Sequence, residues 1–179
     1  TIGFNASYRQ EGESFAKQVL SVRPNARVAV LYQNDDLGKD YLLGLRTGFG
    51  ERADEMIVAE QSFNVEDPTV DAQIIALKNS GANVFANIAT PRAAAQAIRK
   101  AFDIGWRPLQ FVPEVANSIE TVIKPAGVEK AVGAISFSYY KDPVDPQWSS
   151  DADTQQYFAF MKQYYPRGDA FDSNNVFAY

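Results

Sequence analysis

The chain has 179 residues, of which 46% are hydrophobic and 22% are charged, a composition typical of one globular domain with a substantial core. Its 17 basic and 22 acidic residues give a net charge of −5 without a cluster of lysine and arginine, which argues against nucleic-acid binding. Cysteine and histidine are absent, so cysteine nucleophiles, Ser/His/Asp triads and cysteine-rich zinc sites are excluded.

The first half of the chain alternates predicted strands and helices. The uniformly apolar run at 28–32 indicates a parallel strand that is covered on both faces. Asp67-Pro68 predicts a helix start, with Asp67 as N-cap and the proline at the first helical position. We expect, in order, a short strand at 1–4, a helix from Ser7 or Tyr8 to Ser21, a strand at 28–32, a helix at about 38–49, a strand at 56–63 and a helix after Asp67 that Gly81 closes.

The second half continues the alternation. Its predicted elements are a strand at 84–88, a helix from Thr90-Pro91 to Gly105, a strand at 109–112, a short helix at 118–124 stopped by Pro125, a strand at 131–138, a loop at 142–149 and a helix at about 153–165 with Phe158, Met161 and Tyr165 facing inward. The order predicts a doubly wound α/β fold with a mostly parallel sheet and helices on both faces.

Four predicted loops follow the carboxyl ends of these strands, where ligands bind in open parallel sheets. They lie at 33–37, 89–90, 113–114 and 139–140. The chain has no GxGxxG or GxxxxGK[ST] motif there, which disfavours a nucleotide phosphate and Rossmann-type redox chemistry. We therefore expect a site for another kind of small molecule, without a metal or a cofactor.

Side chains in these loops each have two interpretations. Residues 34–36, Asn-Asp-Asp, either bind a cation or cap the next helix, and capping is favoured because carboxylates satisfy free N–H groups there. Glu114 follows an apolar strand, so it either receives a ligand ammonium group or is a solvated loop residue. Thr90 is either a simple N-cap or an N-cap that also offers its hydroxyl group to a ligand. One of Tyr139 and Tyr140 faces the site, or both line the following loop.

Several segments resemble the branched-chain-amino-acid type of periplasmic substrate-binding protein, a receptor of ABC importers. The resemblance covers nearly the whole chain and rests on GFNASYRQEGESFAKQVL, RVAVLYQNDDLGKDYLLGLRTGF, DPTVDAQIIALKNSGANVFANIATP and AAAQAIRKAFDIGW. It implies two α/β lobes that are joined by a hinge and close on a ligand between them. Residues 1–179 then form the second lobe, entered from a hinge crossover near residues 1–5, with the first lobe and the C-terminal return absent.

The same resemblance implies binding and delivery to a membrane permease rather than catalysis. It implies a periplasmic or lipid-anchored extracytoplasmic location, with a signal peptide upstream of Thr1. A start without methionine and an end inside the apolar pattern of residues 177–179 agree with a piece of a longer protein.

The resemblance also implies which residues bind the ligand. It places the acidic residue that binds the ligand ammonium group at Glu114. Positions that hold aromatic side chains in members selective for branched-chain amino acids fall on Leu37, Thr90 and Asn174. The full set of expected ligand-binding residues is Glu114, Thr90, Leu37, Tyr8, Tyr139 and Asn174.

The departures at Leu37, Thr90 and Asn174 leave other ligands and roles open. Smaller or more polar side chains leave room for an amino acid with a larger side chain or for an aromatic carboxylate. An acid without an amine gives Glu114 no cation, which weighs against it unless a carboxyl is protonated or bridged by water. Two further alternatives are the ligand-sensing domain of a signalling protein and a carboxylate-based hydrolase, and the hydrolase is disfavoured because no nucleophile, base and orienting group converge.

Overall fold

A computed structural model describes residues 5–143 and 145–179 of the chain, and these residues form one sheet of five parallel strands. The strands are β1 (Val28–Gln33), β2 (Ile57–Phe63), β3 (Val84–Ile88), β4 (Leu109–Val112) and β5 (Ile135–Ser136). Their order across the sheet is β2-β1-β3-β4-β5, so the winding reverses between β1 and β3. This topology confirms the predicted doubly wound α/β fold.

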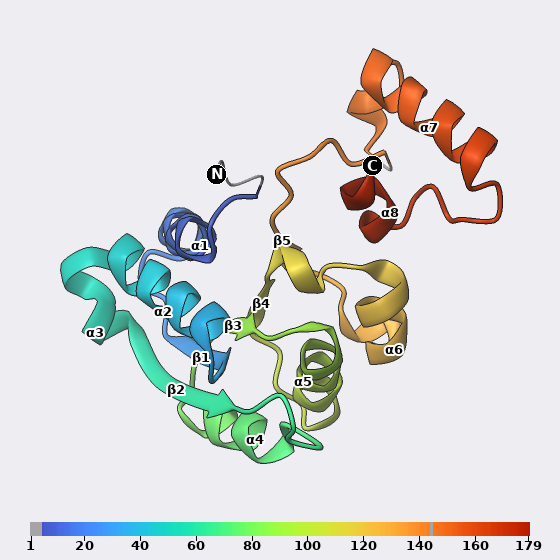
Figure 1. Cartoon of the computed structure of the whole chain (residues 1–179). Helices are drawn as coiled ribbons and strands as arrows, with labels where there is room; N and C mark the ends of the chain where they lie inside the picture. The colour runs from blue at the N-terminus through green and yellow to red at the C-terminus, as the bar shows by residue number, and fades with distance from the viewer. Residues whose placement is uncertain (1–4, 144) are drawn as a thin grey trace.

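Helices cover both faces of the sheet (Figure 1). One face carries α1 (Tyr8–Val22), α2 (Asp36–Phe49) and the short α3 (Ala53–Met56). The other face carries α4 (Asp71–Asn79), α5 (Pro91–Asp103) and the short α6 (Lys124–Ala126). Figure 1 shows α7 (Ala152–Tyr164) and α8 (Ser173–Ala178) as an arm beyond β5, in orange and red.

Short helical turns complete the described part of the chain. Four are 3-10 turns, η1 (Gly50–Arg52), η2 (Glu114–Ala116), η4 (Val128–Lys130) and η5 (Pro146–Trp148), and η3 (Ile119–Ile123) is a π-helical turn. None of the helices in the described part of the chain is long and apolar enough to cross a membrane.

Each face of the sheet has its own aromatic core. Under α1, the Phe15 ring lies 5.3 Å from the ring of Phe111 and 4.7 Å from that of Phe137. On the opposite face Phe85 packs 5.0 Å from Trp106, whose indole N–H donates to a backbone carbonyl 3.1 Å away. Large aromatic side chains of this kind supply much of the buried apolar area that stabilises a domain.

Three glycines, Gly12, Gly44 and Gly48, let α1 and α2 pack backbone against backbone. A Cβ atom on Gly44 would lie 2.2 Å from the carbonyl oxygen of Arg9, and one on Gly12 would lie 2.5 Å from that of Tyr41. Any larger residue would therefore push the helices apart. The close contact brings the first turns of α1 beside Tyr41, whose ring centre lies 5.3 Å from that of Tyr8.

The helix after β2 begins later than predicted. The Asp67 carboxylate accepts the N–H of Asn64 at 2.8 Å, so it closes a turn of the β2–α4 loop instead of capping a helix. α4 begins at Asp71, and Val70 occupies its N-cap. The prediction of Asp67-Pro68 as the helix start was therefore wrong, because the Asp67 carboxylate accepts a hydrogen bond from Asn64, which precedes it in the loop.

The region after β4 also differs from the prediction. The expected strand at 131–138 is reduced to the two residues of β5. The helical path expected to stop at Pro125 continues through it, because proline lies in the first turn of α6, where no N–H is needed.

The C-terminal arm departs from the predicted helix face. The inward residues of α7 are Thr154, Tyr157 and Met161, whereas Phe158 is partly exposed and Tyr165 is exposed. α8 was not assigned from the sequence. The strand expected at residues 1–4 lies outside the described residues.

Candidate functional site

Acidic and tyrosine side chains meet at the carboxyl edge of the sheet. Glu114 follows β4, and Tyr139 and Tyr140 follow β5, so the parallel arrangement brings them to the same edge. Tyr8 and Glu11 lie at the beginning of α1, and Tyr41 lies in the second turn of α2. We refer to these six residues as the Glu114 cluster.

Glu114 is the partly buried carboxylate of this cluster. It begins η2 directly after the buried Pro113. Burial raises the pKa of Glu114, and the nearby hydroxyl groups of Tyr140 and Tyr139 offset part of that effect. A desolvated carboxylate held by neutral donors is suited to receive a cation, because a positive charge restores the ionised form.

Glu11 is a second and more deeply buried carboxylate, which was not predicted from the sequence. Only 7% of its surface is exposed, and its Oε1 accepts the backbone N–H of Glu114 at 2.7 Å. Burial raises the pKa of Glu11, and the charge of Glu114 adds to this effect. The sequence does show that Glu11 lies one helical turn before Phe15, on the side of α1 that faces the core, and this spacing is the signal that it could be buried.

The pKa values of the tyrosines Tyr41 and Tyr139 are raised beside the two carboxylates. Tyr41 is fully buried, and burial followed by the charge of Glu11 raises its pKa. Its hydroxyl group approaches Glu11 closely enough to lower that carboxyl's pKa, although the contact falls short of full hydrogen-bond geometry. Burial, followed by the charges of Glu114 and Glu11, raises the pKa of Tyr139 to about 12. These tyrosines therefore stay protonated at neutral pH and act as neutral donors.

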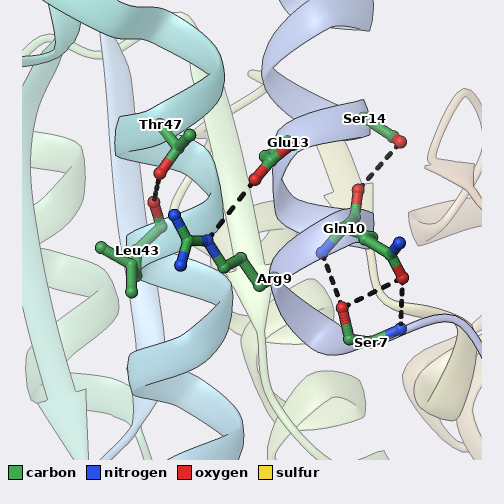
Figure 2. A network of polar contacts seen from close by, with 7 residues as sticks. All are labelled: Ser7, Arg9, Gln10, Glu13, Ser14, Leu43 and Thr47. Carbon is green, nitrogen blue, oxygen red and sulfur yellow. Dashed lines mark hydrogen bonds and ion pairs between the residues drawn. The ribbon is translucent and has the colours of Figure 1, made fainter. Parts of the chain in front are cut away.

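A pocket of about 300 Å³ opens between α1 and the segment after β5. It is lined by Ala6, Gln10, Glu11, Ser14, Phe137, Ser138 and Tyr139. At its rim, Ser7 and Gln10 form a capping box that fixes the start of α1, as Figure 2 shows. The pocket gives a small molecule access to the edge of the Glu114 cluster.

Three expected ligand residues have other partners. Thr90 occupies the N-cap position of α5, as predicted, but its side chain makes no cap bond, and its hydroxyl group donates to Oε1 of Gln33 at 2.7 Å. Leu37 is partly buried against the core under α1 and α2. Asn174 donates to the hydroxyl oxygen of Ser118 at 3.2 Å.

The structure therefore divides the expected residues into two sets. Glu114 and Tyr139 are in contact, and Tyr8 joins them through its stacking on Tyr41. In the described part of the chain, Leu37, Thr90 and Asn174 share no hydrogen bond or ring contact with Glu114.

Asp35 caps α2. Its Oδ1 accepts the N–H of Gly38 at 3.1 Å, which confirms the favoured interpretation of the acidic turn. Among residues 5–143 and 145–179, no group of three or more acidic side chains lies close enough to hold a metal ion.

Comparisons with known proteins agree with this architecture. The family described as "Periplasmic binding protein" matches residues 1–179. No curated protein sequence matches the chain.

Solved structures of low sequence identity share the fold. A substrate-binding periplasmic protein from Ralstonia solanacearum has a TM-score of 0.78 at 20% identity, with 96% of this chain and 47% of that chain covered. A branched-chain amino acid transporter substrate-binding protein from Streptococcus pneumoniae, solved in complex with isoleucine, has a TM-score of 0.75 at 18% identity over 96% and 47% of the two chains. A putative branched-chain amino acid ABC transporter from Rhodospirillum rubrum has a TM-score of 0.74 at 15% identity over 89% and 44%. The chain thus spans about half the length of these structures.

Proposed function

Because the chain belongs to the periplasmic binding protein family, and its fold matches one lobe of the type I periplasmic binding fold, we propose that it is the second lobe of an extracytoplasmic solute receptor. The receptor binds a small amino acid in the cleft between two lobes, and Glu114 binds the ligand ammonium group. The other lobe, joined by a hinge near residues 1–5, supplies the groups for the ligand carboxylate.

One observation carries the choice of ligand: Glu114 is partly buried at the site edge, and no lysine or arginine of the described residues forms an ion pair with it. Burial raises its pKa, and the groups that offset this effect are the neutral hydroxyl groups of Tyr139 and Tyr140. In the described part of the chain, no lysine or arginine forms an ion pair with Glu114 or Glu11. A ligand ammonium group therefore supplies the missing positive charge.

The same charges weigh against an aromatic carboxylate without an amine. Such a ligand would place a third negative group beside Glu11 and Glu114. Like charges at short range disfavour one another, more so where water is excluded. We therefore rank amino acids above amine-free acids.

Binding, rather than catalysis, is the proposed activity. Ligand contacts made only in the closed form shift the equilibrium towards closure, and an ABC permease in the membrane recognises the closed receptor. A periplasmic or lipid-anchored extracytoplasmic location follows from this role.

Matched ligand pairs test the proposal. Thermal melting of the full-length protein is measured with L-phenylalanine against 3-phenylpropionate, and with L-leucine against 4-methylpentanoate, because each pair differs only in the amine. Selective binding to the folded state raises the melting midpoint by mass action. We expect a shift with at least one amino acid and none with its amine-free partner.

Two variants identify the residue responsible. Glu114→Gln is expected to abolish the shift with the amino acid. Glu66→Gln removes the same charge from an exposed position in the β2–α4 loop and is expected to leave the shift intact. Equal shifts with the amine-free acids, or with Glu114→Gln, would overturn the ammonium role.

A further inference from the structure

A hydrogen bond joins two parts of the chain that are 103 residues apart in sequence, the first turn of α1 and the end of β4. The Glu11 carboxylate accepts the backbone N–H of Glu114 at 2.7 Å, and this carboxylate is 7% exposed. Burying a carboxylate costs free energy unless hydrogen bonds or a partner charge compensate for its lost hydration. Its partner here is the main chain of the residue proposed to bind the ligand.

The Glu114 N–H lacks a local acceptor. Glu114 is the first residue of η2, and Pro113 at the N-cap makes no side-chain cap bond. N–H groups at the beginning of a helical turn are left without intrahelical partners and need an acceptor from elsewhere. Glu11 supplies that acceptor, and a bond from an N–H to a carboxylate is stronger than one to a neutral oxygen.

The helix that carries Glu11 is itself held in place. The Ser7 hydroxyl accepts the N–H of Gln10 at 3.2 Å, and the Gln10 side chain accepts the N–H of Ser7 at 3.0 Å (Figure 2). The next residue after Glu11 is Gly12, which packs against the backbone of α2. Glu11 therefore reaches η2 from a rigid support.

We propose that Glu11 is a positioning residue for Glu114: by holding the backbone N–H of η2 it places the Glu114 carboxylate between Tyr139 and Tyr140, where the ligand ammonium group binds. The ligand part of this proposal rests on the proposed function. The titratable groups that face Glu11 are Tyr41 of α2, Glu114 after β4 and Tyr139 after β5. None of the three is a cation, so the alternative to positioning is that Glu11 acts only by adding negative charge.

Two substitutions separate the effect of the Glu11 side-chain length, which we call its reach, from the effect of its charge. Glu11→Gln keeps the side-chain length and the Oε1 acceptor but removes the charge. Glu11→Asp keeps the charge but is one methylene shorter, so it no longer reaches the N–H of Glu114. Glu13→Gln, at a partly exposed position of the same helix and paired with Arg9, is the control for loss of one charge from α1 (Figure 2).

Affinity is measured by calorimetry on the full-length protein with the amino acid of the panel, L-phenylalanine or L-leucine, that gives the larger melting shift. We expect Glu11→Asp to weaken binding about tenfold, the size of one lost hydrogen bond to a charged group. Glu11→Gln is expected to lose less than Glu11→Asp. The reverse order would show that the charge of Glu11 matters more than its reach, and equal losses would show that reach makes no difference, so either result would overturn positioning.

A second readout needs no ligand. Burial raises the pKa of Glu114. If Glu11 holds η2, Glu11→Asp should release Glu114 to solvent and lower its pKa towards the ordinary range, whereas Glu11→Gln should leave it raised. Carbon-13 NMR of labelled glutamate side chains measures this titration in the ligand-free protein.

The two readouts distinguish failure of each proposal. If no amino acid binds but the pKa of Glu114 falls only in Glu11→Asp, positioning stands and the amino acid ligand is wrong. If the pKa of Glu114 is the same in both variants, positioning is wrong whatever binds. If Glu11→Asp strongly lowers the melting midpoint, Glu11→Ala replaces it. Glu11→Ala and Glu11→Gln both lack the charge, and only Glu11→Gln can still accept the N–H of Glu114.

Discussion

The hydroxyl group of Thr90 donates to Oε1 of Gln33 at 2.7 Å and so joins the end of β3 to the end of β1. Gln33 is 5% exposed, and its amide donates in turn to Asp35, which caps α2 through the N–H of Gly38. The central strands and α2 are thus connected by one chain of side-chain hydrogen bonds at the carboxyl edge of the sheet.

Removal of the Thr90 hydroxyl group should destabilise the chain. Thr90→Val keeps the shape but leaves a buried acceptor on Gln33 unpaired, which costs about 1–3 kcal/mol of unfolding free energy. Thr90→Ser keeps the hydroxyl group and should lose much less. Urea unfolding of both variants checks this, and equal stabilities would show that the bond contributes nothing.

The contact between α1 and α2 should not tolerate a methyl group. Gly44→Ala places a Cβ against the carbonyl oxygen of Arg9 and should lower the unfolding free energy by about 1–3 kcal/mol, the usual cost of overpacking. Leu43→Ala, at the preceding and exposed position, is the control and should change it by about 0.5 kcal/mol or less. The midpoints of thermal or urea unfolding of the two variants measure these changes.

Among single truncations on the face of the sheet covered by α1 and α2, loss of the Phe15 ring should lower the unfolding free energy most. Phe15 is fully buried against Phe111, Phe137 and Tyr41, and Phe→Ala in such a position costs about 3–5 kcal/mol. Phe160→Ala removes an equal ring from an exposed position of α7 and should cost far less. A small effect of Phe15→Ala in urea unfolding would contradict the assignment of this core.

Glu11 should make stability depend on pH. Its pKa is raised in the folded chain above the ordinary 4.5, because burial and the charge of Glu114 disfavour ionisation. The folded state therefore binds more protons than the unfolded state in the window above 4.5, and the unfolding free energy falls as pH rises through that window.

Glu11→Gln removes this titration. The difference in unfolding free energy between the variant and the native chain should be small at low pH, where Glu11 is protonated, and should grow in favour of the variant as pH rises. Urea unfolding at several pH values measures the difference, and Glu13→Gln serves as the control. A difference that does not change with pH would show that Glu11 titrates as an ordinary glutamate.

The sheet and most helices could be predicted because their signals are local. The apolar runs that form β1 and β3 are uniform because both faces of these strands are buried. The start of α4 was misplaced because Asp67 and Asp71 both suit a helix start, and only the fold shows that Asp67 serves the N–H of Asn64. β5 was overestimated because an apolar segment at the sheet edge pairs over only two residues.

The candidate site was predictable only in part. Glu114 could be placed at the end of its strand because a charge there breaks the apolar pattern. Glu11 was not, because one glutamate in an amphipathic helix resembles a solvated residue until its partner is known. Asn174 was proposed from a resemblance along the sequence, and in the fold its side chain binds Ser118. The ligand roles of all these residues stay predictions.

The arm of α7 and α8 is attached through a small polar junction. Ser118 donates to Asp172 at 3.1 Å and accepts from Asn174, while within the arm the Tyr157 hydroxyl group donates to the carbonyl of Ala170 at 3.0 Å. The arm thus has internal contacts of its own, and we expect it to open as a separate cooperative unit. Its backbone amides should exchange with deuterium through local opening, well before those of β1 and β3, which exchange only when the whole sheet unfolds.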